Sequence, residues 1–341
     1  EDAFMGLEKL SKITFGEIGV IKSSTGYEAD LPSLKELVFN DITHSLAFTS
    51  RAFRNADIEK IVLPANLSEV EGLPACAGYE ISADNERFFV DDGVLYETRG
   101  GNLYLASYPV RKAAGSYTVK DGTKAIGSYA FDYAQVKKVI CPESLTQIGG
   151  IELSNNGFYG SKIESMEFRA TGEINIGGYA FAICAKLNDI SIVKGAELNV
   201  YHGAFAYCES LREFPYEKVK YIGDSAFYGA GVEYFEFGGN IEYLGAFSFK
   251  YSALKSAVFT GDRKYLPGGM FENGEIESVE LGNIQIVGAE AFQCCNNLTD
   301  VSGVNVTTVR EYAFSRCGVK AINFPDVTEI GVGAFSSSNV E

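Results

Sequence analysis

An Ala-Phe pair recurs along the chain at nearly constant spacing, and this repetition constrains the fold more than any other feature. Successive anchor phenylalanines stand 21 to 27 residues apart from residue 131 onward. A fixed period of roughly 20 to 50 residues is typical of solenoids, in which each repeat buries its apolar side on its neighbours. The sequence therefore predicts a single solenoid over residues 1–341, with the anchors Phe131, Phe158, Phe181, Phe205, Phe227, Phe249, Phe271, Phe292, Phe314 and Phe335.

Each repeat reads I-G-x-x-A-F-x-x-small-x-x-L-x-x-I-x-F/L, as in IGDSAFYGAGVEYFEF from Ile222. The last two apolar positions alternate with other residues, which places both on one face of a short strand. Stacked repeats would line these strands into a parallel sheet on one face of the solenoid. The G-x-x-A-F-x-x-small segment is too short for more than one helical turn. We therefore expect a β-rich repeat solenoid with short helical turns.

The repeat is weaker before residue 125. Residues 1–75 carry strand phrases such as LPSLKELVF, from Leu31, and are assigned to degenerate N-terminal repeats. Residues 76–124 form an irregular segment in which FFVDDGVLYETRGGNLYLASYP alternates polar and apolar residues around RGGN. Two alternating runs joined by a Gly-containing turn are typical of a β-hairpin. We expect one inserted β-hairpin there, followed by regular repeats over residues 125–341.

Charge narrows the class of partner. The chain has 341 residues and a formal net charge of −16. Nucleic-acid binding requires a basic face that releases counterions, and anionic membrane surfaces attract basic segments. The sequence has no run of about 18 apolar residues. We therefore expect no nucleic-acid partner and no direct membrane insertion.

The cysteines are interpreted as packing residues. Four of the seven stand three residues after an anchor phenylalanine, where other repeats have Ala134, Ala230 or Ser252. A position that accepts Cys, Ala or Ser selects for small volume, and a buried free cysteine behaves as a small hydrophobe. Disulfides and a metal site are the alternatives, and the odd count and the lack of C-x-x-C disfavour them. The four cysteines are Cys184, Cys208, Cys295 and Cys317.

Catalytic chemistry has little support in the sequence. His44 and His202 are the only histidines, so two nearby histidines for a metal site are not expected. No G-x-S-x-G, P-loop or H-E-x-x-H phrase is present. We expect a protein that is not an enzyme, with no catalytic residue, no metal and no cofactor.

The repeats resemble those of the BspA-type leucine-rich-repeat family of bacterial surface proteins, whose unit reads roughly I-G-x-x-A-F-x-x-C-x-x-L-x-x-I-x-I-P. The phrase DDGVLYETRGGNLYLASYP, followed by YTVKDGTKAIGSYAF, also resembles an interruption typical of that family. The chain departs from the pattern at Gly157, Ser248 and Met270, before three anchors, and at Lys120, where the family often has Pro. The resemblance implies a right-handed leucine-rich-repeat superhelix in a secreted or surface-anchored protein that takes part in binding or adhesion.

The outward side chains of the predicted strand row are the candidate binding residues. They flank the central apolar residue of each strand and make an acidic row with one main aromatic residue. The solvated face of a sheet is the simpler interpretation, and a concave acidic strip for a basic protein segment is the functional one. The hairpin is a second candidate, because function is often found on loops. The predicted residues are Glu167, Asp189, Ser191, Tyr234, Glu236, Glu280 and Asp300 on the strands, and Arg99 and Asn102 at the hairpin tip.

These observations predict a non-enzymatic bacterial cell-surface or secreted protein that binds a protein ligand, with host extracellular-matrix or cell-surface proteins as candidate partners. The alternative is a structural spacer or presentation scaffold without its own ligand, since both ends fall at Ala-Phe anchors without a polar capping repeat. The chain begins with EDAF, without an initiator Met or an apolar signal segment, so we expect that a signal or lipid anchor has been removed. We expect an extracellular or surface-bound monomer.

Overall fold

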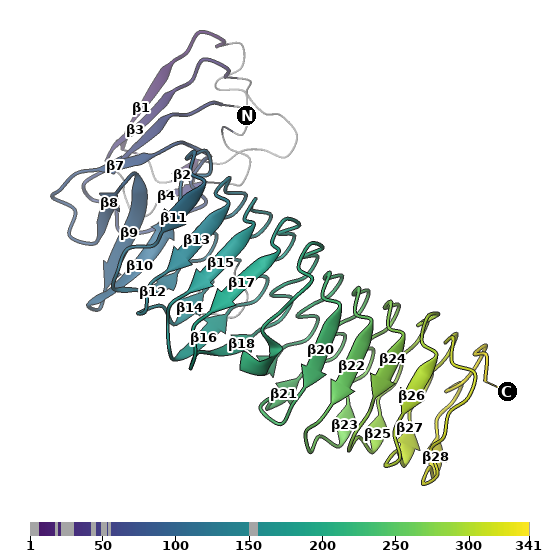
Figure 1. Cartoon of the computed structure of the whole chain (residues 1–341). Coiled ribbons are helices and arrows are strands. Elements are labelled where there is room, and N and C mark those ends of the chain that lie inside the picture. The colour runs from purple at the N-terminus through teal and green to yellow at the C-terminus, as the bar shows by residue number, and fades with distance from the viewer. Residues whose placement is uncertain are drawn as a thin grey trace.

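The computed structural model describes residues 7–17, 20–21, 31–41, 46–48, 53, 56–149 and 156–340. It is a solenoid of about 13 coils, whose short strands form rows along the molecule (Figure 1). Within the described residues, every strand pairing is parallel except those of β8 (Phe88–Asp91) with β9 (Val94–Arg99) and of β9 with β10 (Asn102–Ser107). The β9–β10 hairpin is the predicted one, and β8 adds a second hairpin that shares β9. The predicted β-rich repeat solenoid with an inserted hairpin is therefore confirmed.

The first row of strands is the one that the L-x-x-I-x-F spacing predicts. Neighbouring strands pair in register, so that the inward Val139 faces Met166 and Met166 faces Ile190. The row comprises three four-stranded sheets: β1 (Lys12–Glu17), β3 (Glu36–Asp41), β5 (Lys60–Leu63) and β7 (Tyr79–Ile81); β11 (Ser116–Thr118), β13 (Lys138–Cys141), β15 (Ser165–Phe168) and β17 (Asp189–Ile192); β20 (Tyr234–Phe237), β22 (Ser256–Phe259), β24 (Ser278–Glu280) and β26 (Asp300–Ser302).

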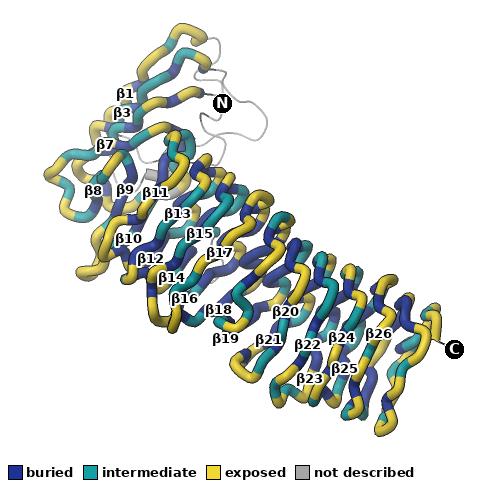
Figure 2. The backbone as a smooth tube through the Cα atoms, in the orientation of Figure 1, coloured by how far each residue is buried: buried dark blue, intermediate teal, exposed yellow. Residues whose placement is uncertain are grey.

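A second row of strands, which the sequence pattern did not reveal, ends at the Ile of each I-G phrase. Figure 2 shows buried and exposed residues alternating along the coils that carry both rows. This row comprises β2 (Val20–Ile21), β4 (Leu46–Phe48) and β6 (Val70–Glu71); β8 (Phe88–Asp91), β9 (Val94–Arg99), β10 (Asn102–Ser107), β12 (Thr123–Ile126), β14 (Gln147–Ile148), β16 (Glu173–Ile176), β18 (Glu197–Val200), β19 (Val219–Ile222) and β21 (Tyr243–Leu244); β23 (Tyr265–Leu266), β25 (Ile286–Val287), β27 (Thr308–Val309) and β28 (Glu329–Ile330).

The hairpin strand β9 separates two apolar cores. Leu95 packs into the core of the N-terminal coils, whereas Val94 and Tyr96 pack into the core of the remaining coils. Alternate side chains of a strand point to opposite faces, so one strand can serve both cores. The hairpin therefore covers an end of each core while β10 pairs with β12 of the regular array.

The chain re-enters the repeat at Tyr108. The Tyr108 N–H donates to the Ala130 carbonyl at 2.7 Å, as the Phe131 N–H donates to the Gly157 carbonyl one coil later. The Tyr108 ring also stacks on Phe131 with centroids 4.7 Å apart. Tyr108 thus takes the place of the anchor in the coil that precedes Phe131.

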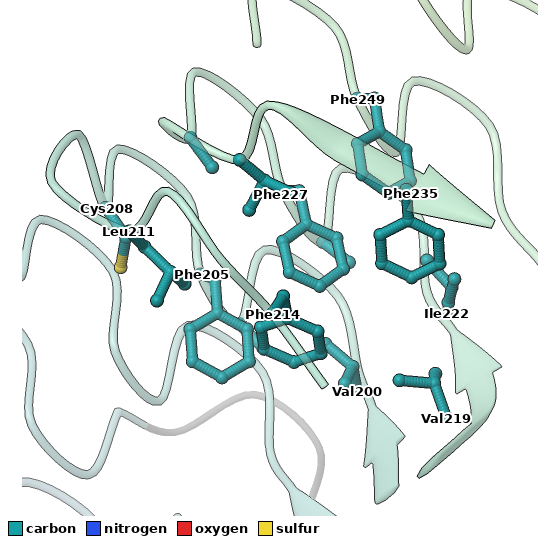
Figure 3. Packing of buried hydrophobic residues seen from close by; sticks show 14 of the residues in the cluster. Val200, Phe205, Cys208, Leu211, Phe214, Val219, Ile222, Phe227, Phe235 and Phe249 are labelled. Atoms are coloured by element: carbon teal, nitrogen blue, oxygen red, sulfur yellow. The ribbon is translucent and has the colours of Figure 1, made fainter. Parts of the chain in front are cut away.

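The anchor phenylalanines form a continuous stack through the core. Consecutive ring centroids lie from 4.4 Å apart, between Phe131 and Phe158, to 6.1 Å apart, between Phe249 and Phe271. Figure 3 shows Phe205, Phe227 and Phe249 of this stack. Offset aromatic pairs at such distances add about 0.5–1.5 kcal/mol beyond the burial of their area.

The Ala-Phe segments consist of successive turns instead of helical turns. Around Phe181, the backbone of Tyr179 has a φ of 55° and that of Ile183 a φ of 60°. The Ala182 N–H donates to Tyr179 within its coil, whereas the Ile183 N–H donates to Ala206 of the next coil. These segments therefore join neighbouring coils through every second amide. The one helix in the described residues is the 3-10 helix η1 (Tyr216–Lys218), and no described helix has the length and apolarity to cross a bilayer.

Aromatic side chains at these left-handed positions cover glycines of the following coil. A Cβ added at Gly203, whose φ is 59°, would lie 2.5 Å from the Tyr179 ring. A glycine therefore leaves room for the ring and adopts the left-handed conformation at low cost. The pairs are Tyr133 with Gly160, Tyr179 with Gly203, Tyr207 with Gly229, Phe247 with Gly269, and Tyr312 with Gly333.

This pairing predicts coupled effects on stability. Gly203→Ala should lower the free energy of unfolding by about 2 kcal/mol, because left-handed φ costs a residue with a Cβ about 1–2 kcal/mol and the methyl group meets the ring. Tyr179→Ala removes the ring and with it the clash between the ring and the new methyl group. The double variant should therefore lose less free energy of unfolding than the sum of the two single variants, by about 0.5 kcal/mol or more. Urea unfolding followed by circular dichroism measures all three.

Ser225→Ala is the matched control, because Ser225 has the equivalent position one coil later and already has a Cβ at a φ of 56°. Its effect should stay within about 0.5 kcal/mol. Strictly additive losses for Gly203→Ala and Tyr179→Ala would contradict the pairing.

Candidate functional site

The first group of predicted residues lies on β15 and β17. In the parallel register Ser165 faces Asp189, and Glu167 faces Ser191. Glu167 forms two salt bridges, since Lys138 Nζ and Arg169 Nε each lie 3.0 Å from one of its carboxylate oxygens. Hydrogen bonds from these two cations, that of Lys138 first, lower the pKa of Glu167. Of this group Asp189 is the exposed carboxylate without such an ion pair within the described chain.

The second group lies on the sheet of β20, β22, β24 and β26. Each strand contributes two outward residues, and the parallel register aligns them into two columns. Hydroxyl groups link one column, since the Ser278 Oγ donates to the Ser256 Oγ at 3.2 Å. The columns are Tyr234, Ser256, Ser278 and Asp300, and beside them Glu236, Val258, Glu280 and Ser302.

A coil without a strand in the first row separates the two groups. Where the other coils have that strand, this coil has Pro215 followed by η1. Proline cannot donate a ladder hydrogen bond, so the first-row sheet ends at β17 and a new sheet begins at β20. Tyr216 of η1 packs against Tyr234 with ring centroids 5.6 Å apart. The sequence-predicted row is therefore two surfaces and not one strip.

Charge neutralisation also differs along the first row. In the N-terminal sheet Lys60 lies 3.5 Å from Glu36 and 3.3 Å from Glu80. On the sheet of β20 to β26, the structure shows no basic group within 4 Å of the described carboxylates of Glu236, Glu280 or Asp300. We call the exposed surface formed by Tyr234, Glu236, Glu280 and Asp300 the acidic patch.

The outward residues of the patch are regularly aligned. Glu236 accepts a hydrogen bond from the Thr260 hydroxyl at 3.2 Å, and Tyr234 keeps 43% of its surface exposed. Glu236 and Glu280 stand two strands apart, which corresponds to about 9.5 Å at the usual spacing of neighbouring strands. Its carboxylates thus form a field of one sign on a rigid backbone.

Arg99 and Asn102 lie apart from these groups. They are exposed at the tip of the β9–β10 hairpin, where Gly100 and Gly101 have φ values of 58° and 77°. The Arg99 guanidinium lies over the Tyr104 ring at 5.0 Å. Because β9 and β10 belong to the second row, the structure does not bring the tip residues into the acidic patch.

The cysteines sit where coils meet. Cys184 Sγ donates to the Phe158 carbonyl of the preceding coil at 3.0 Å, and Cys208 and Cys295 make the equivalent bonds to Phe181 and Phe271. All seven cysteines are free, and all except Cys294 are buried. Burial raises the pKa of Cys184 to about 12, so its thiol stays protonated near neutral pH.

Of the two histidines, the structure describes His202. The His202 Nε2 and the Tyr179 hydroxyl lie 2.6 Å apart at the exposed turn edge, and His44 lies outside the described residues. Over the part of the chain that the structure describes, no three His, Cys, Asp or Glu side chains gather as metal ligands would.

A cavity of about 400 Å³ lies at a place that the sequence analysis did not single out. Its lining includes Glu242, Asp262, Arg263, Lys264 and Tyr265. A signal was available, because Arg263 stands three residues before the inward Leu266, where the neighbouring coils have Ile241 and Ile284. Alignment of this second inward position would have revealed it.

Comparison with known proteins identifies the family. The model of the BspA type leucine rich repeat region matches residues 1–73, 112–231 and 220–341, in six copies. The chain belongs to this family. The unmatched residues 74–111 contain the two hairpins formed by β8, β9 and β10. No curated protein matches the chain.

Solved structures similar to this BspA-type chain include three bacterial proteins, of which the first shares its fold. A leucine-rich repeat protein from Bacteroides ovatus has 18% sequence identity and a TM-score of 0.50, with 94% of this chain and 84% of that one covered. The pneumococcal vaccine antigen PcpA has 18% identity and a TM-score of 0.43, with 95% and 68% covered. A leucine rich cell surface protein from Faecalibacterium prausnitzii has 19% identity and a TM-score of 0.35, with 98% and 65% covered.

The thiol environments predict one reactive cysteine. At pH 8, Cys294 should react with Ellman's reagent first, because the six other thiols are buried. A pKa of about 12 leaves Cys184 with roughly a thousandfold less thiolate than an ordinary thiol. All seven should react at once in urea. Cys294→Ser should abolish the fast phase, and a fast phase that persists in this variant would show that a buried thiol is accessible.

Proposed function

We propose that this protein is a non-enzymatic binding or adhesion module that recognises a basic protein segment through the acidic patch. The observation that carries the proposal is the set of carboxylates without ion pairs on one sheet, whereas Glu36, Glu80 and Glu167 on the other first-row sheets are bound by lysine or arginine, although Asp189 is not. Carboxylates of one sign, held at fixed spacing, attract a cationic partner and accelerate its encounter.

The patch has features of a binding surface beyond its charge. Tyr234 supplies an exposed ring, and tyrosine is enriched at protein interfaces. Ser256 and Ser278 offer hydroxyl groups between the two acidic ends of the patch. The parallel sheet below holds these groups in place, so little conformational entropy is lost when a partner binds.

The setting of the protein is part of the proposal. We place it outside the cell or on a bacterial surface, as a monomer whose partners are host extracellular-matrix or cell-surface proteins. Membership of the BspA-type family supports this placement, and the negative charge of the chain suits a basic partner.

The acidic patch predicts a charge-dependent interaction. A surface plasmon resonance assay with an oligolysine peptide and a panel of matrix proteins should give binding that weakens as salt rises, because salt screens exposed charges. Glu236→Lys combined with Glu280→Lys should weaken the binding about tenfold or more, since each reversal replaces an attraction of about 1 kcal/mol by repulsion.

Glu86→Lys combined with Glu143→Lys is the control with the same change of net charge, because both residues are exposed and lie outside the patch. Equal losses in both double variants would show that net charge, and not the patch, attracts the peptide. Absence of binding to the peptide and the whole panel would favour the structural spacer instead.

A further inference from the structure

Arg263 occupies a position that is aliphatic in the coils on either side. The residue three before the last inward residue of the second-row strand is a buried Leu145, Val219, Ile241, Ile284 or Val306 in five coils, and Thr123, Glu173 or Glu197 in three others. Arg263 has this position before Leu266. Its guanidinium donates to the Ile241 carbonyl at 2.7 Å, and the described chain offers it no carboxylate within 4 Å. An arginine therefore lies half-buried and without a counter-ion in a strongly acidic protein.

Pro267, in the same coil, breaks the second-row sheet. In other coils the residue after the last inward position donates its N–H to the preceding coil, as Gly245 does to Ile222 and Gly288 does to Leu266. Pro267 has no N–H, so the Leu244 carbonyl lacks this donor. Accordingly, β21 and β23 belong to separate sheets, and within the described chain no backbone bond joins the Lys264 or Tyr265 amide to the preceding coil.

The cavity described above lies beside this break. Gly238, Gly239 and Gly261 line it without side chains that could fill it. The anchor stack is also widest here, with 6.1 Å between Phe249 and Phe271. On the opposite side of the coil β20 and β22 remain paired, so the opening is confined to the second row.

We propose that this cavity binds a sugar that bears a carboxylate, with Arg263 as the residue that recognises the carboxylate. The planar guanidinium can donate two parallel hydrogen bonds to a carboxylate. The lining also carries the carboxylates of Glu242 and Asp262, which repel a phosphate dianion more strongly than a monoanion. Glu242, Asp262 and the unpaired amides can bond sugar hydroxyl groups, and the half-exposed Tyr265 provides a ring for the sugar to cover.

Isotope-edited NMR of the whole chain tests this assignment. Titration with methyl glucuronide should shift the amide signals of Lys264 and Tyr265. Methyl glucoside lacks the carboxylate, and acetate and inorganic phosphate lack the sugar hydroxyl groups. Each of these three should therefore bind at least about tenfold more weakly. Shifts confined to other regions, or equal affinity for the glucoside or for phosphate, would overturn the proposal.

Arg263→Leu is the decisive variant, because it supplies an aliphatic residue as in the neighbouring coils and should preserve or raise the melting temperature. It should weaken glucuronide binding by about tenfold or more. Arg310→Leu, at an exposed arginine after β27, is the matched control and should bind as the original chain does. Equal binding by the Arg263→Leu variant would overturn the assignment. Glu280→Lys should leave sugar binding intact, so failure of the acidic patch and failure of the cavity are distinguishable.

Discussion

The contact between an anchor ring and the equivalent ring of the next coil is the interaction on which the rest of the structure depends. Each coil is too small to bury its own apolar side, and the stacked rings supply the contacts that it lacks. The backbone strengthens the same contact, because the Phe205 N–H donates to Ala226 of the next coil at 2.8 Å. Stacking and hydrogen bonding therefore fix the same register, and the strand rows on either side follow from it.

A strand could be predicted from the sequence where inward apolar residues alternate with outward residues over several positions. Strands of the first row have two inward residues two positions apart, such as Phe235 and Phe237, and this spacing gives a recognisable period of two in the sequence. Second-row strands such as β14 and β21 have two residues each, and only one of the two is inward. A single inward residue gives no period that could be recognised in the sequence. Left-handed turns were also hidden, because tyrosine at Tyr179 gives no sign of positive φ. The sign lies one coil later, at Gly203, and is visible only once the coils are aligned.

The candidate site was predicted as residues but not as a surface. Outward positions follow from the alternation, so Glu236 and Glu280 were found without knowledge of the fold. The ion pair of Glu167 with Lys138, 29 residues earlier in the sequence, depends on residues in different coils. Such contacts arise from the register between coils, which residue spacing within a repeat does not specify.

Departures from the repeat carry most information where two of them share a coil. Gly157 and Ser248 each replace the alanine before an anchor and are accommodated singly within a preserved stack, whereas Met270 lies in the coil of Arg263 and Pro267, where Phe249 and Phe271 are 6.1 Å apart. Arg263 and Pro267 act together, because one removes an apolar contact and the other removes a hydrogen bond on the same side of one coil. A solenoid tolerates this, since β20, β22 and the anchor stack still join the coils on the other side. A local opening between two coils can therefore persist here without separating the rest of the solenoid.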